Sequence, residues 1–295
     1  MREPAPRPSS HRPQPLGLLR CPVCEEPLAA ADGALRCRRR HSFDIARQGY
    51  VSLLAGGQVT GEGDSADMVR ARVAFLAAGH YAPLAESVAA SCPPGARTVL
   101  DAGAGTGYYL AAALDALPEA VGLGLDASKF ALRRAARSHP RAGAASWDVW
   151  RPLPVPDRAV DVLLNVFAPR NGPEFHRVLR PSGRLVVVTP TERHLGELRA
   201  WEGLLLRVDA EKENRLRRAL AGHFTRERVT PLEYVRRLAS EDVADVVLMG
   251  PAARHVTGEE VRRRVAALPT PLGVTMSFTV SVYRPLPESG SGGAR

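Results

Sequence analysis

A glycine-rich turn in the middle of the chain restricts its possible folds more than any other sequence feature. Residues 101–107 read D-A-G-A-G-T-G, with the apolar segment 98–100 before them and a helical pattern that opens at Tyr108 after them. Glycines permit tight turns and let a ligand approach the backbone closely. Dinucleotide sites prefer the spacing G-x-G-x-x-G rather than this G-x-G-x-G. The turn alone therefore indicates a nucleotide-type cofactor without identifying it.

The segments on both sides of this turn alternate between strand and helix patterns. Two helices, broken near Gly79 and Pro83, are expected within 66–90. The core alternation predicts strands at 97–101, 120–125, 143–147, 159–166 and 184–189, and helices at 107–116, 128–138 and 172–179. Helices at 194–206 and 208–221 and strands at 224–237 and 272–283 follow. This alternation predicts an α/β fold with a parallel sheet covered on both faces, and the late strands form its antiparallel edge.

Polar residues stand at the ends of three successive strands. Asp126 ends the second strand, Asp148 follows the third, and Asn165 lies at the end of the fourth. A carboxylate at the end of the second strand is well placed to hold ribose hydroxyls, and the next one can accept a hydrogen bond from an adenine amine. Either acid taken singly fits an ordinary solvated loop, whereas their order favours a cofactor site.

Three cysteines and a histidine near the N-terminus form a second motif. Cys21, Cys24, Cys37 and His41 have the spacing C-x2-C-x12-C-x3-H. Four nitrogen and sulfur ligands in two close pairs suit a tetrahedral, structural Zn²⁺ site. A redox pair or coincidence is the alternative. We expect a hairpin turn at Gly33 between the two pairs.

The charge of the chain points to a polyanionic partner. The 295 residues carry a formal net charge of +9, and the sequence pI is about 10.0. Arginines at 36 and 38–40 surround the second ligand pair, where we expect them to lower the thiolate pKa and to contact phosphate. No recognition helix separates the ligand pairs, so DNA reading is not expected. An arginine-rich coding bias is the alternative, since Lys129 and Lys212 are the only lysines.

The sequence also restricts the cellular setting. No run of eighteen apolar residues is present, so neither a membrane span nor a membrane partner is expected. The arginine- and proline-rich segment 1–15 lacks the apolar core of a secretory signal. We therefore expect a cytoplasmic protein, in which clustered cysteines bind metal rather than form disulfides. Cys92 stands apart and is expected to be a free thiol.

Longer stretches add specificity to these motifs. They are Cys21–Cys24, Cys37–Val51, Asp64–Met68, Phe75–Tyr81, the glycine-rich turn and Thr189–Leu195. Through them the chain resembles the 23S rRNA (guanine-N1)-methyltransferase family of the RlmA/TlrB type, over nearly its whole length after Leu16. Segments 165–170 and 148–150 look closer to the macrolide-resistance branch of that family.

The resemblance implies a fold, an activity and cofactors. The fold is a zinc-ribbon-like module attached to a Rossmann-like, seven-stranded class I methyltransferase domain. The activity is methylation by S-adenosylmethionine of N1 of a guanine in a 23S rRNA hairpin loop near the peptide exit tunnel, with macrolide (tylosin-type) resistance as a consequence. It also implies that the four zinc ligands are retained and that Tyr81, the glycine loop and His194 contact the cofactor. The predicted cofactor residues are Tyr81, Asp101, Gly103, Gly105, Thr106, Gly107, Asp126, Asp148 and His194.

Catalytic roles are assigned from chemistry. Guanine N1 carries a proton at neutral pH, so a general base or an enolate-stabilising donor assists the transfer. Asp64 or Asp67 is the candidate base, and capping of the following helix is the alternative for both. Asn165 and Arg170 are candidates for contacts to guanine or phosphate, with a surface charge as the alternative for Arg170.

A splayed-out target base needs a flat surface to rest on. Three aromatic residues near the predicted sheet mouth are candidates, with core packing as the alternative: Phe167, Trp150 and Trp147.

The expected domain organisation follows from these motifs. Residues 1–15 and 288–295 are expected to be disordered, 16–54 to form the zinc module, 55–90 a connector with helices over the cofactor site, and 91–287 the methyltransferase domain. Two other functions remain open: methylation of another RNA or a small molecule, and zinc-dependent RNA binding with a vestigial cofactor fold. The sequence does not fix the oligomeric state, and a homodimer stays open.

Overall fold

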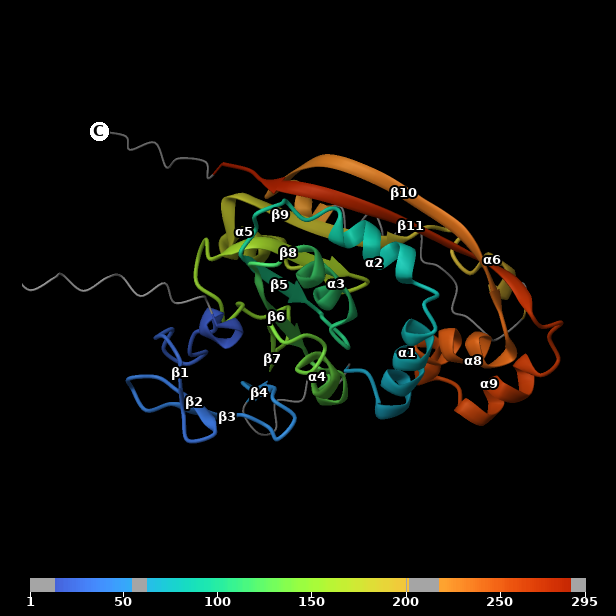
Figure 1. Cartoon of the computed structure of the whole chain (residues 1–295), viewed down its shortest axis with the longest axis horizontal. Coiled ribbons are helices and arrows are strands. Elements are labelled where there is room, and N and C mark those ends of the chain that lie inside the picture. The colour runs from blue at the N-terminus through green and yellow to red at the C-terminus, as the bar shows by residue number, and fades with distance from the viewer. Residues whose placement is uncertain (1–13, 55–62, 200, 202–217, 288–295) are drawn as a thin grey trace, which may run out of the picture.

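An eight-stranded sheet organises the computed structural model, which describes residues 14–54, 63–199, 201 and 218–287 (Figure 1). Its strand order is β10-β11-β9-β8-β5-β6-β7-β4. Five central strands run parallel: β5 (Thr98–Ala102), β6 (Val121–Asp126), β7 (Ala142–Ser146), β8 (Val160–Val166) and β9 (Leu179–Pro190). The chain runs outward from β5 in both directions, so β5 marks the point where the strand order reverses. Open α/β sheets bind ligands at that point, beyond the carboxyl ends of the strands.

Helices cover both faces of this sheet, as the β-α-β pattern predicts. They are α2 (Ala82–Ala89), α3 (Tyr108–Ala116), α4 (Lys129–Ala135), α5 (Gly172–Val178) and α6 (Gly196–Arg199). Helix α1 (Ala66–Ala77) lies beyond the carboxyl ends of the strands (Figure 1). The central strands are almost wholly buried, which explains their continuous apolar sequences. Of the helices expected at 194–206 and 208–221, only α6 is described there. Residues 200 and 202–217 lie outside the described part of the chain.

Two long antiparallel strands close one edge of the sheet. β10 (Phe224–Leu238) pairs with β11 (Leu272–Pro285), which pairs with β9. The connection between them contains α8 (Ser240–Leu248), η2 (Pro251–Arg254) and α9 (Gly258–Val265). Helix α8 packs against α1, and these helices form a cap beyond the carboxyl ends of the strands (Figure 1). The cap was not predicted from the sequence, because α9 buries only Val261 and Val265 and carries a charge at every other position except Gly258.

The N-terminal module is a small antiparallel sheet. After η1 (Pro15–Leu18), strands β1 (Ala29–Ala31), β2 (Ala34–Arg36) and β3 (Ser42–Asp44) pair in that order. Asp32 and Gly33 both have positive φ, at 48° and 75°, as a two-residue type I′ hairpin turn requires. The hairpin expected at Gly33 is therefore confirmed.

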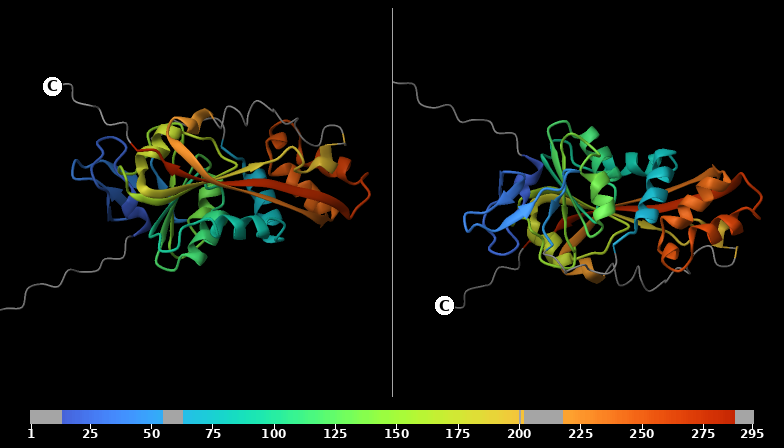
Figure 2. Two further views of the ribbon diagram at one scale, coloured as in Figure 1. Left: turned by 90° about the horizontal axis from the view of Figure 1, so that it is seen from above. Right: turned by 90° about the horizontal axis from the view of Figure 1, so that it is seen from below.

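The same module contributes a strand to the large sheet. β4 (Val51–Ser52) lies parallel to β7, with Val51 opposite Ala145. The seven strands expected for the methyltransferase domain are thus present, and β4 adds an eighth at the edge. Leu19 and Leu35 of the module join one core cluster with Leu100 and Leu123 of the large sheet. Module and sheet therefore share a core, with the module beside the β7–β4 edge (Figures 1 and 2, blue).

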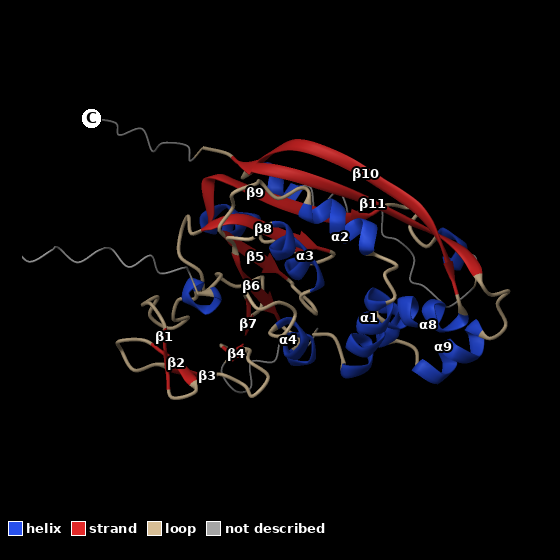
Figure 3. Ribbon diagram, viewed as in Figure 1, coloured by secondary structure: helices blue, strands red, loops and turns tan. Residues whose placement is uncertain are grey.

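Figure 3 shows how helices and strands are distributed, with strands through the centre and helices on either side and at the cap. Among the described residues, no helix has both the length and the apolar character needed to cross a bilayer.

Candidate metal centre and cofactor site

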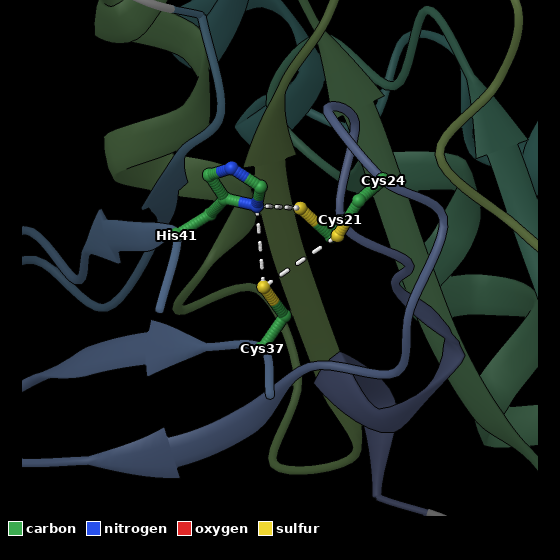
Figure 4. Close-up of side chains that lie close together, drawn as sticks. All are labelled: Cys21, Cys24, Cys37 and His41. Atoms are coloured by element: carbon green, nitrogen blue, oxygen red, sulfur yellow. Dashed lines mark hydrogen bonds between the residues drawn. The ribbon is translucent and has the colours of Figure 1, made fainter. Parts of the chain in front are cut away.

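The four predicted zinc ligands converge in the N-terminal module (Figure 4). Their ligand atoms all lie within 4.8 Å of one another. The separations include 3.5 Å from Cys21 Sγ to His41 Nδ1, 3.3 Å from Cys37 Sγ to His41 Nδ1, and 3.6 Å from Cys24 Sγ to Cys37 Sγ. A tetrahedral Zn²⁺ with bonds of about 2.3 Å to sulfur and about 2.0 Å to nitrogen places its ligand atoms roughly 3.5–3.8 Å apart. The residues present therefore fit zinc with no position left for a further ligand.

Two tight turns hold the ligands in place. The N–H of Cys21 donates to the carbonyl of Glu26, and the N–H of Cys37 donates to the carbonyl of His41. Glu25 and Arg40 adopt positive φ of 60° and 66° within these turns. Such conformations are strained for residues other than glycine, so the turns need an additional source of stability. Ligation of one metal by both turns supplies it.

The thiols of the cluster differ in pKa. Burial raises the pKa of Cys21 to about 11. Burial also acts to raise the pKa of Cys37, but hydrogen bonds outweigh it and lower the pKa to about 7; they come from the backbone of His41, the Cys24 side chain, the backbone of Arg39 and the His41 side chain. No arginine side chain is among these main causes, and the guanidinium groups are exposed. The expectation that the arginines lower the thiolate pKa stays a prediction.

The glycine loop lies at the carboxyl end of β5, where the sequence predicted it. Gly103, Gly105 and Gly107 have φ of 87°, 54° and 80°, a region in which side chains are strained. A Cβ on Gly103 would lie 2.4 Å from the Cβ of Ala168. The loop thus packs directly against the turn that follows β8, and α3 begins immediately after Gly107. Thr106 is half-exposed in the same loop.

Asp126 fixes the shape of the loop from the neighbouring strand. Its Oδ2 accepts the Gly105 N–H at 2.8 Å, and its Oδ1 accepts the Ser128 N–H at 2.8 Å. Burial raises the pKa of Asp126, and these two hydrogen bonds oppose the shift. One carboxylate therefore couples the glycine loop to the start of α4.

Asp101 supplies the test of cofactor fit. Its side chain is 1% exposed, and neither carboxylate oxygen has a hydrogen-bond partner. Burial, with a smaller effect of Asp126, raises its pKa to about 8. A buried carboxylate without partners is costly unless a ligand satisfies it. S-Adenosylmethionine carries an ammonium and a sulfonium, so its positive charges fit this orphaned carboxylate.

Two other predicted cofactor residues contact each other at the far side of the loop. Ser277 donates its N–H to His194 Nδ1 at 3.3 Å, which assigns the hydrogen to Nε2, and Nε2 donates to the Tyr81 hydroxyl at 3.0 Å. Burial lowers the pKa of His194 to about 3, with a smaller effect of Arg199, so the ring is neutral. Burial likewise raises the pKa of Tyr81 well above its usual value. Tyr81 is therefore a neutral donor whose own proton is free to point elsewhere.

Asp148 lies beyond β7, next along the carboxyl edge after Asp101 and Asp126. Its Oδ1 accepts the Trp150 N–H at 3.0 Å. The structure thus places three predicted cofactor carboxylates along consecutive strands, and their roles stay predictions.

The turn after β8 contains the other predicted substrate contacts. Asn165 is fully buried, its amide donating to the carbonyls of Ala102 and Pro169 and accepting from Arg170 Nε. This geometry favours a positioning role for Asn165, and its catalytic role stays a prediction. Arg170 is 6% exposed, so it is not the surface charge of the alternative.

Of the three aromatic candidates, Phe167 has the most unusual geometry. It is 45% exposed and has a φ of 56°, a strained conformation that clusters at functional sites. Its ring adjoins those of Tyr81, Tyr109 and Phe278. Trp150 is 63% exposed, whereas Trp147 is buried and donates its indole N–H to Pro152, which favours core packing for Trp147.

The two candidate bases occupy different environments. Asp67 is exposed and pairs with Arg70 at 2.7 Å. Asp64 is largely buried, pairs with Arg72, and accepts a hydrogen bond from the Ser128 hydroxyl through its backbone carbonyl at 2.7 Å. Ser65 caps α1 by accepting the Met68 N–H. The cap is therefore Ser65 rather than either aspartate.

Arg72 is a residue that the sequence reasoning missed. It contacts Asp64, donates to the carbonyl of Met249 at 2.8 Å at the end of α8, and lies 3.4 Å from the position of a Cβ on Gly105. Arg72 thereby links the connector, the cap and the glycine loop. The sequence does mark this position: Arg72 follows Met68 by four residues and precedes Phe75 by three, so it lies on the apolar face of α1.

Comparison with known families covers both parts of this arrangement. Residues 19–56 match the family profile described as RlmA, N-terminal, a zinc ribbon. Residues 99–183 match a profile described as methyltransferase domain. The metal cluster and the glycine loop each fall within one of these segments.

Individual relatives extend over nearly the whole chain. A protein of Micromonospora griseorubida assigned as a 23S rRNA (guanine-N(1)-)-methyltransferase is 51% identical, over 93% of this chain and 99% of its own length. The 23S rRNA (guanine(748)-N(1))-methyltransferase of Streptomyces fradiae is 49% identical, over 91% of this chain and 97% of its own. YxjB of Bacillus subtilis, assigned to the same activity, is 34% identical over 80% of this chain and 86% of its own.

Proposed function

Because this chain belongs to the 23S rRNA (guanine-N1)-methyltransferase family, we propose that it methylates N1 of a guanine in a 23S rRNA hairpin loop and thereby confers resistance to tylosin-type macrolides. The observation that carries the proposal is that the same relatives match both the zinc module and the methyltransferase domain, at 49–51% identity. An enzyme acting on a small molecule needs no basic metal module. We expect the protein to act in the cytoplasm, where ribosomes are found.

S-Adenosylmethionine supplies a methyl group that is already activated by its positive sulfur. The protein therefore contributes mainly alignment. Asp101 offers its unpaired carboxylate to the positive end of the cofactor, and the positive-φ glycines keep the loop free of side chains. Tyr81, held by neutral His194, offers a hydroxyl proton. Asp126 and Asp148 lie at the strand ends where ribose and adenine are expected.

The target base must approach the turn after β8. Ala168 touches Gly103, so Phe167, the residue before it, stands next to the cofactor loop. Its half-exposed ring can stack on a flipped guanine, since every base has a flat face that tolerates such a contact. Buried Asn165 holds the backbone of this turn in place by donating hydrogen bonds to the carbonyls of Ala102 and Pro169.

The N1 proton of guanine must leave during the transfer. Of the two predicted bases, the geometry favours Asp64. Its carboxylate lies with Arg72 against the glycine loop, whereas Asp67 faces solvent. Arg72 orients the Asp64 carboxylate and ties it to the cap through Met249. An Asp64→Asn variant should then lose turnover while it retains affinity for the cofactor.

Primer extension on 23S rRNA tests the proposal. N1 methylation blocks Watson–Crick pairing, so reverse transcriptase should stop at the modified guanine when rRNA has been incubated with the protein and S-adenosylmethionine. Incubation without the cofactor, and with an Asp64→Asn variant, provide the controls. The absence of any cofactor-dependent stop along the 23S rRNA would contradict the proposal.

A further inference from the structure

Helix α4 carries exposed positive charges that the cofactor site does not use. Lys129, Arg133, Arg134 and Arg137 are all exposed. Within the described residues, none of these four side chains has a carboxylate within ion-pairing distance. Residues 127–147 contain no acid at all. This segment is therefore an uncompensated basic surface.

The arrangement of these charges is unfavourable for the helix alone. Lys129 and Arg133 lie four residues apart on α4, which places two like charges on one face of the helix, where they repel each other. Arg137 lies in the turn that follows the helix. The ring of Phe130 lies 5.3 Å from both Lys129 Nζ and the Arg133 guanidinium carbon. Arg141, by contrast, is used inside the protein, where it donates to the carbonyls of Leu117 and Ala120. Four cations remain available to an external polyanion.

The position of α4 connects this surface to both functional sites. Its N-cap, Ser128, donates to Asp126 and to the Asp64 carbonyl beside the glycine loop. Near its other end, Gly49 of the zinc module approaches Ala136, and Tyr50 packs on Leu132 and Ala135. Figure 1 shows α4 between β4 and α1. The helix that carries these cations therefore contacts the zinc module at one end and the residues beside the glycine loop at the other.

The cap helices differ from α4 in charge. Residues 240–265 of the cap contain five acids and four arginines, and Glu260 there pairs with Arg264. A polyanion at the cofactor site is therefore attracted more strongly toward α4 than toward the cap. Phosphate neutralisation is the main source of sequence-independent affinity for nucleic acids.

We infer that the exposed face of α4 binds the phosphate backbone of the RNA stem beneath the target loop, jointly with the zinc module. The inference rests on the proposed function and adds a second docking surface to it. Such contacts position the RNA without reading its sequence. They act on binding rather than on the chemical step.

Two triple variants with the same loss of charge test this inference. The first, called the α4 variant, replaces the arginines of α4 and of the turn that follows it: Arg133→Gln, Arg134→Gln and Arg137→Gln. The control replaces Arg226, Arg228 and Arg237 with Gln; these exposed residues lie on β10, at the opposite edge of the sheet. Affinity for 23S rRNA is measured as a function of salt, together with methylation kinetics and S-adenosylhomocysteine affinity.

The α4 variant should bind RNA about tenfold or more weakly, with a salt slope smaller by roughly 2, because each lost phosphate contact removes about 0.7–0.9 from it. Its KM for RNA should rise, while kcat at saturating RNA and cofactor affinity stay as in the unmodified protein. Equal effects in both variants would overturn the inference, as would a loss of kcat alone. If the unmodified protein binds and methylates no rRNA, the proposed function itself fails.

Discussion

The zinc module and the parallel half of the large sheet reach stable structures by different means. In the module, three strands of three residues each leave few side chains to bury, and two strained turns meet at four ligands. In the sheet, strands β5, β6 and β8 are almost completely buried between helices. Metal ligation stabilises the first region and apolar burial the second, so removing zinc should affect the two unequally.

Their functional groups differ in the same way. The metal cluster has no position left for a substrate, and its surroundings are exposed arginines. The cofactor site instead has a buried carboxylate without partners and a backbone that only glycine adopts without strain. The first region is organised for docking and the second for chemistry. The predictions below test this division, from the largest effect to the smallest.

Zinc removal should have the largest effect. Structural zinc contributes an apparent binding free energy of about 10–16 kcal/mol in small zinc-finger peptides, more than three short strands can replace. After chelation we expect amide hydrogens of residues 19–54 to lose protection from exchange, while those of β5, β6 and β8 keep it. Equal loss of protection in both regions would show that the module and the sheet unfold as one unit.

Gly103→Val should abolish cofactor binding. The valine Cβ would lie 2.4 Å from the Cβ of Ala168, and the backbone at this position has a φ of 87°. The steric clash and the backbone strain together should cost about 2 kcal/mol or more of stability. We expect no measurable S-adenosylmethionine binding by calorimetry, with zinc content unchanged. Gly33→Val, at an open turn of the module, provides a matched control that should keep cofactor affinity.

Asp101→Asn should change the proton balance of binding. Because burial raises the pKa of Asp101 to about 8, the free enzyme holds it protonated at neutral pH, and a positive ligand favours its ionised form. S-Adenosylmethionine binding at neutral pH should therefore release close to one proton, measured from binding heats in buffers of different ionisation enthalpy. The Asn variant should release none and bind more weakly. If the heat of S-adenosylmethionine binding to the unmodified enzyme did not depend on the buffer, Asp101 would not be the group that releases a proton.

Acid should destabilise the region around His194 by a smaller amount. Folding lowers its pKa from 6.5 to about 3, so the unfolded chain takes up a proton first, and stability is lost as pH falls below about 6.5. The loss reaches about 2 kcal/mol near pH 5, since each pKa unit is worth about 1.4 kcal/mol. Burial of Asp101 acts in the opposite direction, because its raised pKa favours the folded state as pH falls from about 8.

Comparison with a His194→Gln variant isolates the contribution of the imidazole. Denaturant unfolding of both proteins across this pH range should show a difference that grows toward acid, with the variant less sensitive. Parallel pH profiles would rule out a buried neutral imidazole.

Much of the fold follows from sequence because local and global signals agree. The apolar strands of the sheet, the broken helices at 66–90 and the Gly33 turn were predicted within a few residues. The cap was missed because α8 and α9 are short, and their buried residues pack mainly on α1 and on each other, with few contacts to the sheet. β4 was missed because a strand of two residues is too short to show an alternating pattern of apolar residues. Its pairing with β7 depends on where the zinc module packs against the sheet.

The site shows the same limit. Spacing identified the metal ligands, because close pairs on tight turns must converge. The role of Arg72, in contrast, depends on α1, α8 and the glycine loop meeting in space, which no local pattern encodes. Likewise, the left-handed backbone of Phe167 is imposed by packing around β8 and is not marked by a glycine.

The separation of docking from chemistry can be measured with one variant, Cys24→Ser. On the same preparation, zinc content, S-adenosylmethionine affinity and the rate of 23S rRNA methylation are determined. We expect zinc to be lost and methylation to fall sharply through a raised KM for RNA, while cofactor affinity stays close to that of the unmodified protein. Loss of cofactor affinity in a variant that keeps the protected strands of the large sheet would contradict it.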